Sequence, residues 1–403
     1  MFQVKPKQST RLLRRPRPPR NDQMYTHMTQ DHEARLIIAA SERDSNLYYA
    51  TQFLAPDPFI FAEIRERRTL IMNELELDRA RDQAEVDEVI PTAKIVNKLR
   101  ERSVKPITTI EIVHFLLKER GAKKLLVPAD FPIEYADGLR TKGYHIRFKS
   151  DPFYEERMIK NKKEIQAIVQ TQRYTERAVR EAVRILEKSK IKGRYLIYKG
   201  KKLTSEHIKQ VINVSLMESG CIAAHTIVAC GKQGVDPHNQ GSGPLHAHES
   251  IIMDVFPHSS HSRYFADMTR TVVRGKASEK LKRMYRAVKQ GQEIAFARIR
   301  NGTDGEKIHN AIAHYFEGLG FQTGEIGGRM QGFFHGTGHG VGLDIHEPPR
   351  ISRGRDILRT GEVVTVEPGL YYLDAGGVRI EDMVLVTKTG CTNLTHFPKI
   401  LEI

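Results

Sequence analysis

Glycine recurs at alternate positions in the stretch 332–350, and this spacing limits what the stretch can form. The stretch contains Gly336, Gly338, Gly340 and Gly342, interspersed with His335, His339 and His346. Alternating glycines weaken an ordinary strand or helix, but a backbone without Cβ atoms can approach an ion or substrate closely. Because neutral imidazole is the commonest metal ligand, the stretch is predicted to form one wall of a metal site. The alternative is a glycine-rich surface loop with incidental histidines.

Four acidic residues lie inside apolar runs that are typical of strands. Asp254 follows Ser-Ile-Ile-Met, Asp267 precedes Met-Thr-Arg-Thr-Val-Val, Glu367 follows Val-Val-Thr-Val, and Glu381 follows Val-Arg-Ile. Ionised carboxylates are almost never buried unless they are paired or bound to a metal. Four of them in strand-like runs therefore predict a bound cation.

These five candidate ligands occur in an order that resembles a known family. The order Asp254, Asp267, His339, Glu367 and Glu381 is similar to that of the pita-bread metallopeptidases, which include methionine aminopeptidase, aminopeptidase P and prolidase. The resemblance implies that the five residues hold a pair of divalent metal ions. The run Gly-His-Gly-Val-Gly-Leu-Asp-Ile-His-Glu-Pro resembles the aminopeptidase P and prolidase branch. In that branch the matching histidines face the substrate, and they are His238, His335 and His346.

The resemblance covers residues 160–403 and has one departure. Asp267 follows Asp254 by 13 positions, two more than is usual in the family, and Phe256 stands where a glycine is usual. If the two strands form an antiparallel hairpin, two extra residues lengthen the turn and preserve the face to which each aspartate points. The departure therefore affects the rim of the predicted pocket and leaves the ligands in place.

Arg379 stands two positions before Glu381, so period-two alternation places both side chains on one strand face. Arg379 is predicted to orient Glu381 or to bind a substrate carboxylate; the alternative is an arginine that faces solvent on an edge strand. The resemblance also places Glu367 against the reactive water, where it would shuttle a proton. His238 and His346 are predicted to stabilise the tetrahedral intermediate. For His238 the alternative is a histidine in a surface turn.

The predicted reaction is attack of a metal-bridging hydroxide on an amide, without a covalent intermediate. Oxygen ligands with one imidazole favour manganese, with cobalt, iron or zinc as alternatives. The remaining histidines are interpreted as non-catalytic, and only His246 and His248 are spaced to bind an adventitious metal.

Three functions compete at this point. The first is a peptidase that removes an amino-terminal residue before proline, from peptides as aminopeptidase P does or from dipeptides as prolidase does. The second is a metal-dependent lyase, a creatinase or another hydrolase of the same fold. The third is a non-catalytic binding module, which the presence of all five ligands disfavours. The substrate predicted by the first function is a peptide or dipeptide with proline in second position.

Composition and net charge bear on the expected partners and cellular compartment of the protein. The net charge is +15, and seven basic residues against one acidic residue lie within residues 1–23. This arm, residues 1–25, is predicted to be a flexible extension, and nucleic acid is not expected as a partner. The chain has no apolar run long enough for a membrane helix, and three cysteines without a Cys-x-x-Cys spacing favour a reducing, cytoplasmic setting.

An α/β (α+β) chain of two domains is predicted. In the second half, helices are predicted near Ile165, from Thr204, after Ser278 and from Thr303, which has capping-box spacing with Glu306. Before residue 150, strands are predicted at residues 35–40, 70–72 and 122–128 and a helix at 110–119, and the segment at Ser45 resembles the amino-terminal domain of creatinase and prolidase. Residues 26–155 are therefore predicted to form that domain, and residues 156–403 a pita-bread catalytic domain. The resemblance implies a pseudo-twofold antiparallel sheet covered by helices, and a homodimer or higher homo-oligomer.

Overall fold

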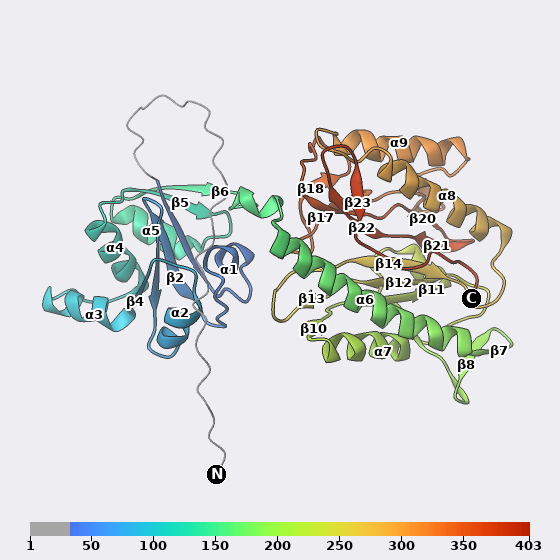
Figure 1. Ribbon diagram of the computed structural model, residues 1–403, viewed down its shortest axis with the longest axis horizontal. Coiled ribbons are helices and arrows are strands. Elements are labelled where there is room, and N and C mark those ends of the chain that lie inside the picture. The colour runs from blue at the N-terminus through green and yellow to red at the C-terminus, as the bar shows by residue number, and fades with distance from the viewer. Residues whose placement is uncertain (1–32) are drawn as a thin grey trace, which may run out of the picture.

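The computed structural model describes residues 33–403, so the predicted basic arm lies outside the described residues. The described chain forms two lobes, with residues 34–149 in one lobe and helix α6 leading into the other (Figure 1). The predicted domain boundaries fall at this division, and they stay predictions. Among residues 33–403 no helix is both long enough and apolar enough to cross a membrane.

The first lobe is a six-stranded mixed sheet with the strand order β4-β3-β2-β1-β5-β6. Strands β1, β2 and β3 pair antiparallel, whereas β4, β5 and β6 join by parallel pairings. The strands predicted at residues 35–40, 70–72 and 122–128 and the helix at 110–119 are confirmed. The elements are β1 (Ala34–Ala39), α1 (Ser45–Thr51), β2 (Phe59–Ile64), β3 (Arg67–Met72), α2 (Leu77–Gln83), β4 (Glu88–Pro91), α3 (Thr92–Glu101), α4 (Thr109–Glu119), β5 (Lys124–Pro128), α5 (Ile133–Thr141) and β6 (His145–Lys149).

The second lobe contains two similar units of paired helices and antiparallel strands. Helices α6 and α7 pack on the sheet β11-β12-β14, and α8 and α9 pack on the sheet β18-β17-β19-β22-β23. In Figure 1 the strands of the two units lie between the two helix pairs. The first unit comprises η1 (Glu155–Met158), α6 (Lys162–Lys188), β7 (Lys190–Lys192), β8 (Tyr195–Tyr198), β9 (Lys201–Lys202), α7 (Ser205–Glu218), β10 (Cys221–Ile222), β11 (Ile227–Cys230), η2 (Gly231–Val235), β12 (Ile251–Val255), β13 (His258–Ser259) and β14 (Met268–Val272).

The second unit completes the lobe and joins the first along β14. It comprises α8 (Glu279–Phe296), α9 (Gly305–Gly318), β15 (Gly324–Ile326), β16 (Arg329–Gln331), β17 (Gly338–Gly340), β18 (Glu347–Ile351), β19 (Val363–Val366), β20 (Gly369–Tyr372), β21 (Gly376–Arg379), β22 (Asp382–Val386) and β23 (Cys391–Asn393). The Glu381 amide donates to the Thr269 carbonyl at 3.1 Å, and the Thr271 hydroxyl donates to the Arg379 carbonyl at 2.8 Å. These bonds form a seam between the two units.

Helix starts follow the predicted capping residues with one correction. Thr204 and Ser278 cap α7 and α8 by accepting from a backbone amide in the first turn, as expected from sequence. Helix α9 is not capped by Thr303 as predicted, because the Asp304 carboxylate accepts from the Glu306 amide instead. A carboxylate at the N-cap also interacts favourably with the helix dipole, which explains why the neighbouring aspartate takes this position.

Candidate metal centre

Asp254 lies on strand β12, and Asp267 immediately precedes β14, which pairs antiparallel with β12. Strand β12 pairs with β14 so that Asp254 stands opposite Thr269. Asp267 precedes Thr269 by two residues, and side chains two apart share a face of a strand. Both carboxylates therefore point to the same side, as predicted. The turn between the strands carries β13, which pairs with β10, so the two extra residues are absorbed there.

His339 is the middle residue of the short strand β17, between Gly338 and Gly340. A Cβ on Gly338 would stand 2.0 Å from the Thr365 carbonyl oxygen, and one on Gly340 would stand 2.3 Å from the Pro348 carbonyl oxygen. The alternating glycines therefore let β17 pack against neighbouring backbone, rather than against an ion or substrate as the sequence suggested. This close packing fixes the backbone that carries His339.

Glu367 directly follows strand β19, and Glu381 lies between β21 and β22, directly before β22. A threonine hydroxyl supports each carboxylate: Thr365 donates to Glu367 Oε1 at 3.4 Å, and Thr269 donates to Glu381 Oε2 at 2.8 Å. Thr365 also accepts from the His339 amide at 3.1 Å. Thr365 stands two positions before Glu367, and Thr269 stands two positions after Asp267. Strand alternation could therefore have indicated both threonines from the sequence.

The five side chains converge on the seam. One donor atom each from Asp267, His339 and Glu381 lies within 4.8 Å of the other two. His339 Nε2 lies 3.4 Å from Glu367 Oε1 and 3.8 Å from Asp267 Oδ2. Among the described residues, three buried carboxylate oxygens have no hydrogen-bond partner, and they are Asp254 Oδ1, Asp267 Oδ1 and Glu381 Oε1. Buried acceptors without donors are costly, so these residues fit a cation.

The electrostatics of the cluster agree with this fit. Burial and the neighbouring carboxylates raise the pKa of Asp267 and of Glu381 well above the usual range. Burial likewise raises the pKa of Glu367 to about 7, and it lowers the pKa of His339 to about 3. Without an ion, the site therefore favours neutral side chains. A bound divalent cation reverses this balance by stabilising carboxylates and neutral imidazole as ligands.

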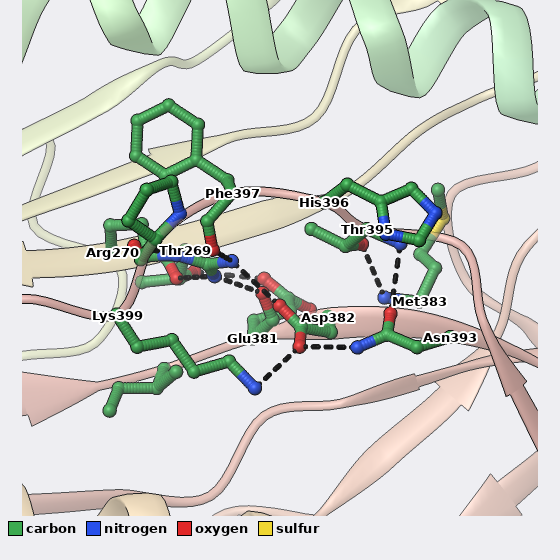
Figure 2. A network of polar contacts seen from close by, with 12 residues as sticks. Thr269, Arg270, Glu381, Asp382, Met383, Asn393, Thr395, His396, Phe397 and Lys399 are labelled. Atoms are coloured by element: carbon green, nitrogen blue, oxygen red, sulfur yellow. Dashed lines mark hydrogen bonds and ion pairs between the residues drawn. The ribbon is translucent and has the colours of Figure 1, made fainter.

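Asp382, next to Glu381, shows what a satisfied buried carboxylate looks like in this lobe (Figure 2). Arg270 donates to Asp382 Oδ1 at 2.8 Å, and Oδ2 accepts from Lys399 at 2.7 Å and from Asn393 at 2.9 Å. Asp382 points to the opposite face of the strand from Glu381 and has two cations as partners. It is therefore not a ligand candidate, although its burial is complete.

Arg379 is buried and bonds Asp254 rather than the Glu381 carboxylate that the sequence suggested. Its Nη2 donates to Asp254 Oδ2 at 2.6 Å, and its Nη1 donates to the Tyr371 hydroxyl at 2.8 Å. The Tyr371 hydroxyl also lies 2.9 Å from His335 Nε2. The chain of contacts Asp254–Arg379–Tyr371–His335 thus links a predicted ligand to a predicted substrate-side histidine. Tyr371 was not recognised from sequence, since a tyrosine in an apolar strand is usually a core residue.

His238 and His346 lie on exposed positions at the edge of the centre. The His346 ring packs edge-on against the His339 ring with 4.3 Å between centroids. Burial lowers the pKa of His335 to about 3, and the charge of His238 contributes to lowering the pKa of both His335 and His346. The three histidines are therefore within electrostatic reach of one another.

The loop that carries His346 is anchored by a buried ionic network that sequence reasoning missed. Glu347 accepts from Lys160 at 2.5 Å and from Arg157 at 3.0 Å, both from the segment that joins the lobes. Arg157 also donates to Asp344 at 2.6 Å, and Ser45 of the first lobe donates to the same carboxylate at 2.6 Å. The first lobe and the joining segment therefore hold this loop directly.

Comparison with known proteins agrees with this geometry. The model of Metallopeptidase family M24 matches residues 166–388. The Xaa-Pro dipeptidase of Pyrococcus horikoshii is 30% identical over 334 residues, which cover 82% of this chain and 84% of that protein. The prolidase structure from Pyrococcus horikoshii is 26% identical with a TM-score of 0.73, over 92% of this chain and 95% of that one. The X-Pro aminopeptidase structure from Thermotoga maritima shares the fold at 24% identity, with a TM-score of 0.75 over 92% and 98%.

The fold and the matched region together define a metal-dependent peptidase of the pita-bread fold, preceded by a creatinase-like amino-terminal lobe. The chain belongs to Metallopeptidase family M24, in the branch of aminopeptidase P and prolidase. The predicted family, fold class and peptidase activity are thereby confirmed, and the family uses divalent metal ions.

Proposed function

We propose that this chain hydrolyses the bond between an amino-terminal residue and proline, as an Xaa-Pro aminopeptidase or an Xaa-Pro dipeptidase. The observation that carries the proposal is the group of unpartnered buried carboxylate oxygens around His339. A buried acidic cluster of this kind is costly unless it holds cations for a function. The Xaa-Pro dipeptidase named among the relatives supports the choice of substrate.

Five residues would hold two divalent ions, and they are Asp254, Asp267, His339, Glu367 and Glu381. Carboxylate oxygens with one imidazole suit manganese, with cobalt, iron or zinc as alternatives. When bound, such a pair supplies Lewis acidity for the scissile carbonyl and a hydroxide nucleophile at neutral pH. Among these side chains His339 binds neutral, which its lowered pKa favours.

Side chains of this protein would transfer the proton, stabilise the oxyanion and position the substrate. Glu367 is the most exposed of the four carboxylates and adjoins His339, so it is placed to take a proton from water and pass it to the leaving nitrogen. His238 and His346 would donate hydrogen bonds to the oxyanion as it develops. Arg379 holds Asp254, and through Tyr371 it orients His335 toward the substrate side.

The preference for proline follows from its chemistry. Proline has no amide hydrogen and a fixed φ, so peptidases that bind an extended strand through that hydrogen cannot use the bond before it. A site specific for this bond needs an apolar pocket with polar groups at the rim. Phe334, which is half-buried, packs against the His335 ring and would supply such a surface.

A substrate panel tests the proposal. Manganese-loaded protein is given Ala-Pro, Ala-Pro-Ala and Met-Ala-Ser at equal concentration, and initial rates are compared. The expected result is faster cleavage of the proline substrates, and cleavage of Ala-Pro alone identifies a dipeptidase. Faster release of the amino-terminal residue from Met-Ala-Ser would refute the proline specificity. If the metal-loaded protein cleaved none of the three peptides, a lyase or a non-catalytic binding module would be favoured.

A matched pair of histidine variants tests the ligand set. His339→Ala should lose bound metal and activity together, whereas His314→Ala, on an exposed position of α9, should keep both. Metal content by elemental analysis and the rate on Ala-Pro are the readouts. Full activity in His339→Ala would overturn the assignment. Light scattering of the same preparations tests the predicted homodimer or higher homo-oligomer.

A further inference from the structure

We propose a second metal site, for a zinc-class ion, formed by Cys230, His246 and Glu249. One donor atom from each side chain, the thiol sulfur, a ring nitrogen and a carboxylate oxygen, lies within 4.8 Å of the other two. The site is separate from the catalytic centre. Cys230 ends β11 opposite Ile251, whereas Asp254 stands opposite Ile227 at the other end of the same pairing, about 10 Å along the strands.

The local fold builds this arrangement from three segments. Cys230 closes strand β11, and the His246 amide donates to its sulfur at 3.3 Å. His246 is held by a bridge to Tyr195 of β8, where the rings also contact at 5.5 Å. Glu249 packs over Gly231, where an added Cβ would meet the carboxylate oxygen at 2.0 Å. The glycine that follows the cysteine therefore leaves the space that the acidic ligand occupies.

The chemistry of the three donors selects the ion. Thiolate, imidazole and carboxylate are the ligands of zinc, and three protein ligands leave a fourth position for water. The catalytic centre offers no sulfur, so the two sites differ in the metals they prefer. Burial raises the pKa of the Cys230 thiol to about 12, so its proton leaves to solvent only as the sulfur–metal bond forms.

The Arg194 guanidinium supplies positive charge at this cluster. Its Nη2 lies 3.2 Å from His246 Nδ1 and 3.6 Å from Glu249 Oε1. Because a guanidinium only donates, the Arg194 contact uses the Nδ1 lone pair, which is the electron pair that a metal ion would take. The same nitrogen lies 3.4 Å from Glu249 Oε2. The Arg194 side chain is 63% exposed, so it can turn into solvent when an ion binds.

Absorption spectroscopy with added Co²⁺ tests the site in the full chain after its catalytic centre has been loaded with manganese. A thiolate ligand gives Co²⁺ a near-ultraviolet charge-transfer band, which nitrogen and oxygen ligands cannot give. Addition of Co²⁺ should produce this band, Cys230→Ser should remove it, and Cys391→Ser should retain it. Cleavage of Ala-Pro with manganese should stay unchanged in Cys230→Ser, which separates this site from the proposed function. The absence of a band at saturating Co²⁺, or its survival in Cys230→Ser, would overturn the proposal.

Two charge variants keep the test decisive even if the cysteine variant folds poorly. Arg194 is a positive charge in contact with His246 and Glu249, so its removal should tighten binding, and Arg194→Gln is expected to lower the half-saturating Co²⁺ concentration about fivefold. Glu249→Gln should raise the half-saturating Co²⁺ concentration. Lys199→Gln, at the residue that follows β8, should leave that concentration unchanged. Binding that is unchanged or weaker in Arg194→Gln would contradict the arrangement.

Discussion

Arg379 donates to Asp254 Oδ2 at 2.6 Å across 125 positions of sequence, and this bond ties the two halves of the second lobe together at the metal centre. Arg379 ends β21, and Asp254 lies in β12 of the other unit. The same guanidinium donates to the Tyr371 hydroxyl, so one buried arginine contacts both a proposed ligand and the tyrosine beside a proposed substrate-side histidine. The positions of Asp254 and His335 are therefore coupled through Arg379 and Tyr371.

Arg379→Lys should lower kcat/KM for an Xaa-Pro peptide about 10- to 100-fold. A lysine keeps the charge but cannot bond both Asp254 and Tyr371, and a hydrogen bond to a charged group is worth about 1.5–3 kcal/mol. Steady-state kinetics on Ala-Pro measures the effect, with Arg286→Lys on an exposed position of α8 as the control. Equal rates in both variants would show that the charge alone is enough.

Tyr371→Phe should lower kcat/KM about 10-fold, because the lost hydroxyl is the hydrogen-bond partner of both Arg379 Nη1 and His335 Nε2. Metal content should stay unchanged, since Tyr371 is not among the ligand candidates. Tyr372→Phe is the matched control, because the Tyr372 hydroxyl donates to the Gln322 carbonyl. A loss of similar size in the control would indicate a general packing defect.

The metal-stripped protein should lose stability as pH rises from about 4 to about 7. The pKa of Glu367 is raised to about 7, and those of Asp267 and Glu381 are raised well above the usual range. Since the unfolded chain releases these protons near pH 4, the stability due to the neutral carboxyl groups is present below that pH and is lost as pH rises toward the folded pKa values. The lowered pKa of His339 acts oppositely up to about pH 6.5, but this one group offsets only one of the three carboxyl groups.

Thermal unfolding at a series of pH values measures this effect. The melting temperature of the stripped protein should fall over this range, and saturating manganese should abolish the fall because bound cations replace the protons. The Glu367→Gln variant, which cannot ionise at this position, should fall less. A flat profile in the stripped protein would contradict the electrostatic description of the centre.

Glu347→Gln should destabilise the fold by about 3–5 kcal/mol, because it leaves Lys160 and Arg157 buried with less compensating charge. Asp137→Asn breaks the exposed pair with Arg140 and should cost less than about 1 kcal/mol. Urea unfolding compares the two variants. A similar small effect in both would mean that the network between the lobes adds little, and the loop with His346 would then be held by other contacts.

The sequence by itself determined the family and most of the elements, and it proposed the ligand set. Carboxylates in apolar strand runs are rare enough to identify Asp254, Asp267, Glu367 and Glu381 as candidates, because burial of a charge without function is costly. Period-two and 3.6-residue patterns are local, so β1, β5, α4 and α6 could be predicted from short windows. Helix caps were predicted to within one residue, since they depend on side chains next to the first turn.

Only the tertiary structure decided which distant groups meet. Arg379 and Glu381 share a strand face, but the contact of Arg379 with Asp254 depends on how β21 lies against β12. The role of the glycines around His339 likewise depends on the neighbouring backbone at Thr365 and Pro348, which local sequence does not reveal. The Cys230 cluster likewise joins the end of β11 to the turn that carries His246 and Glu249. Such long-range contacts follow from packing of the whole chain, and alternation along one strand carries no information about them.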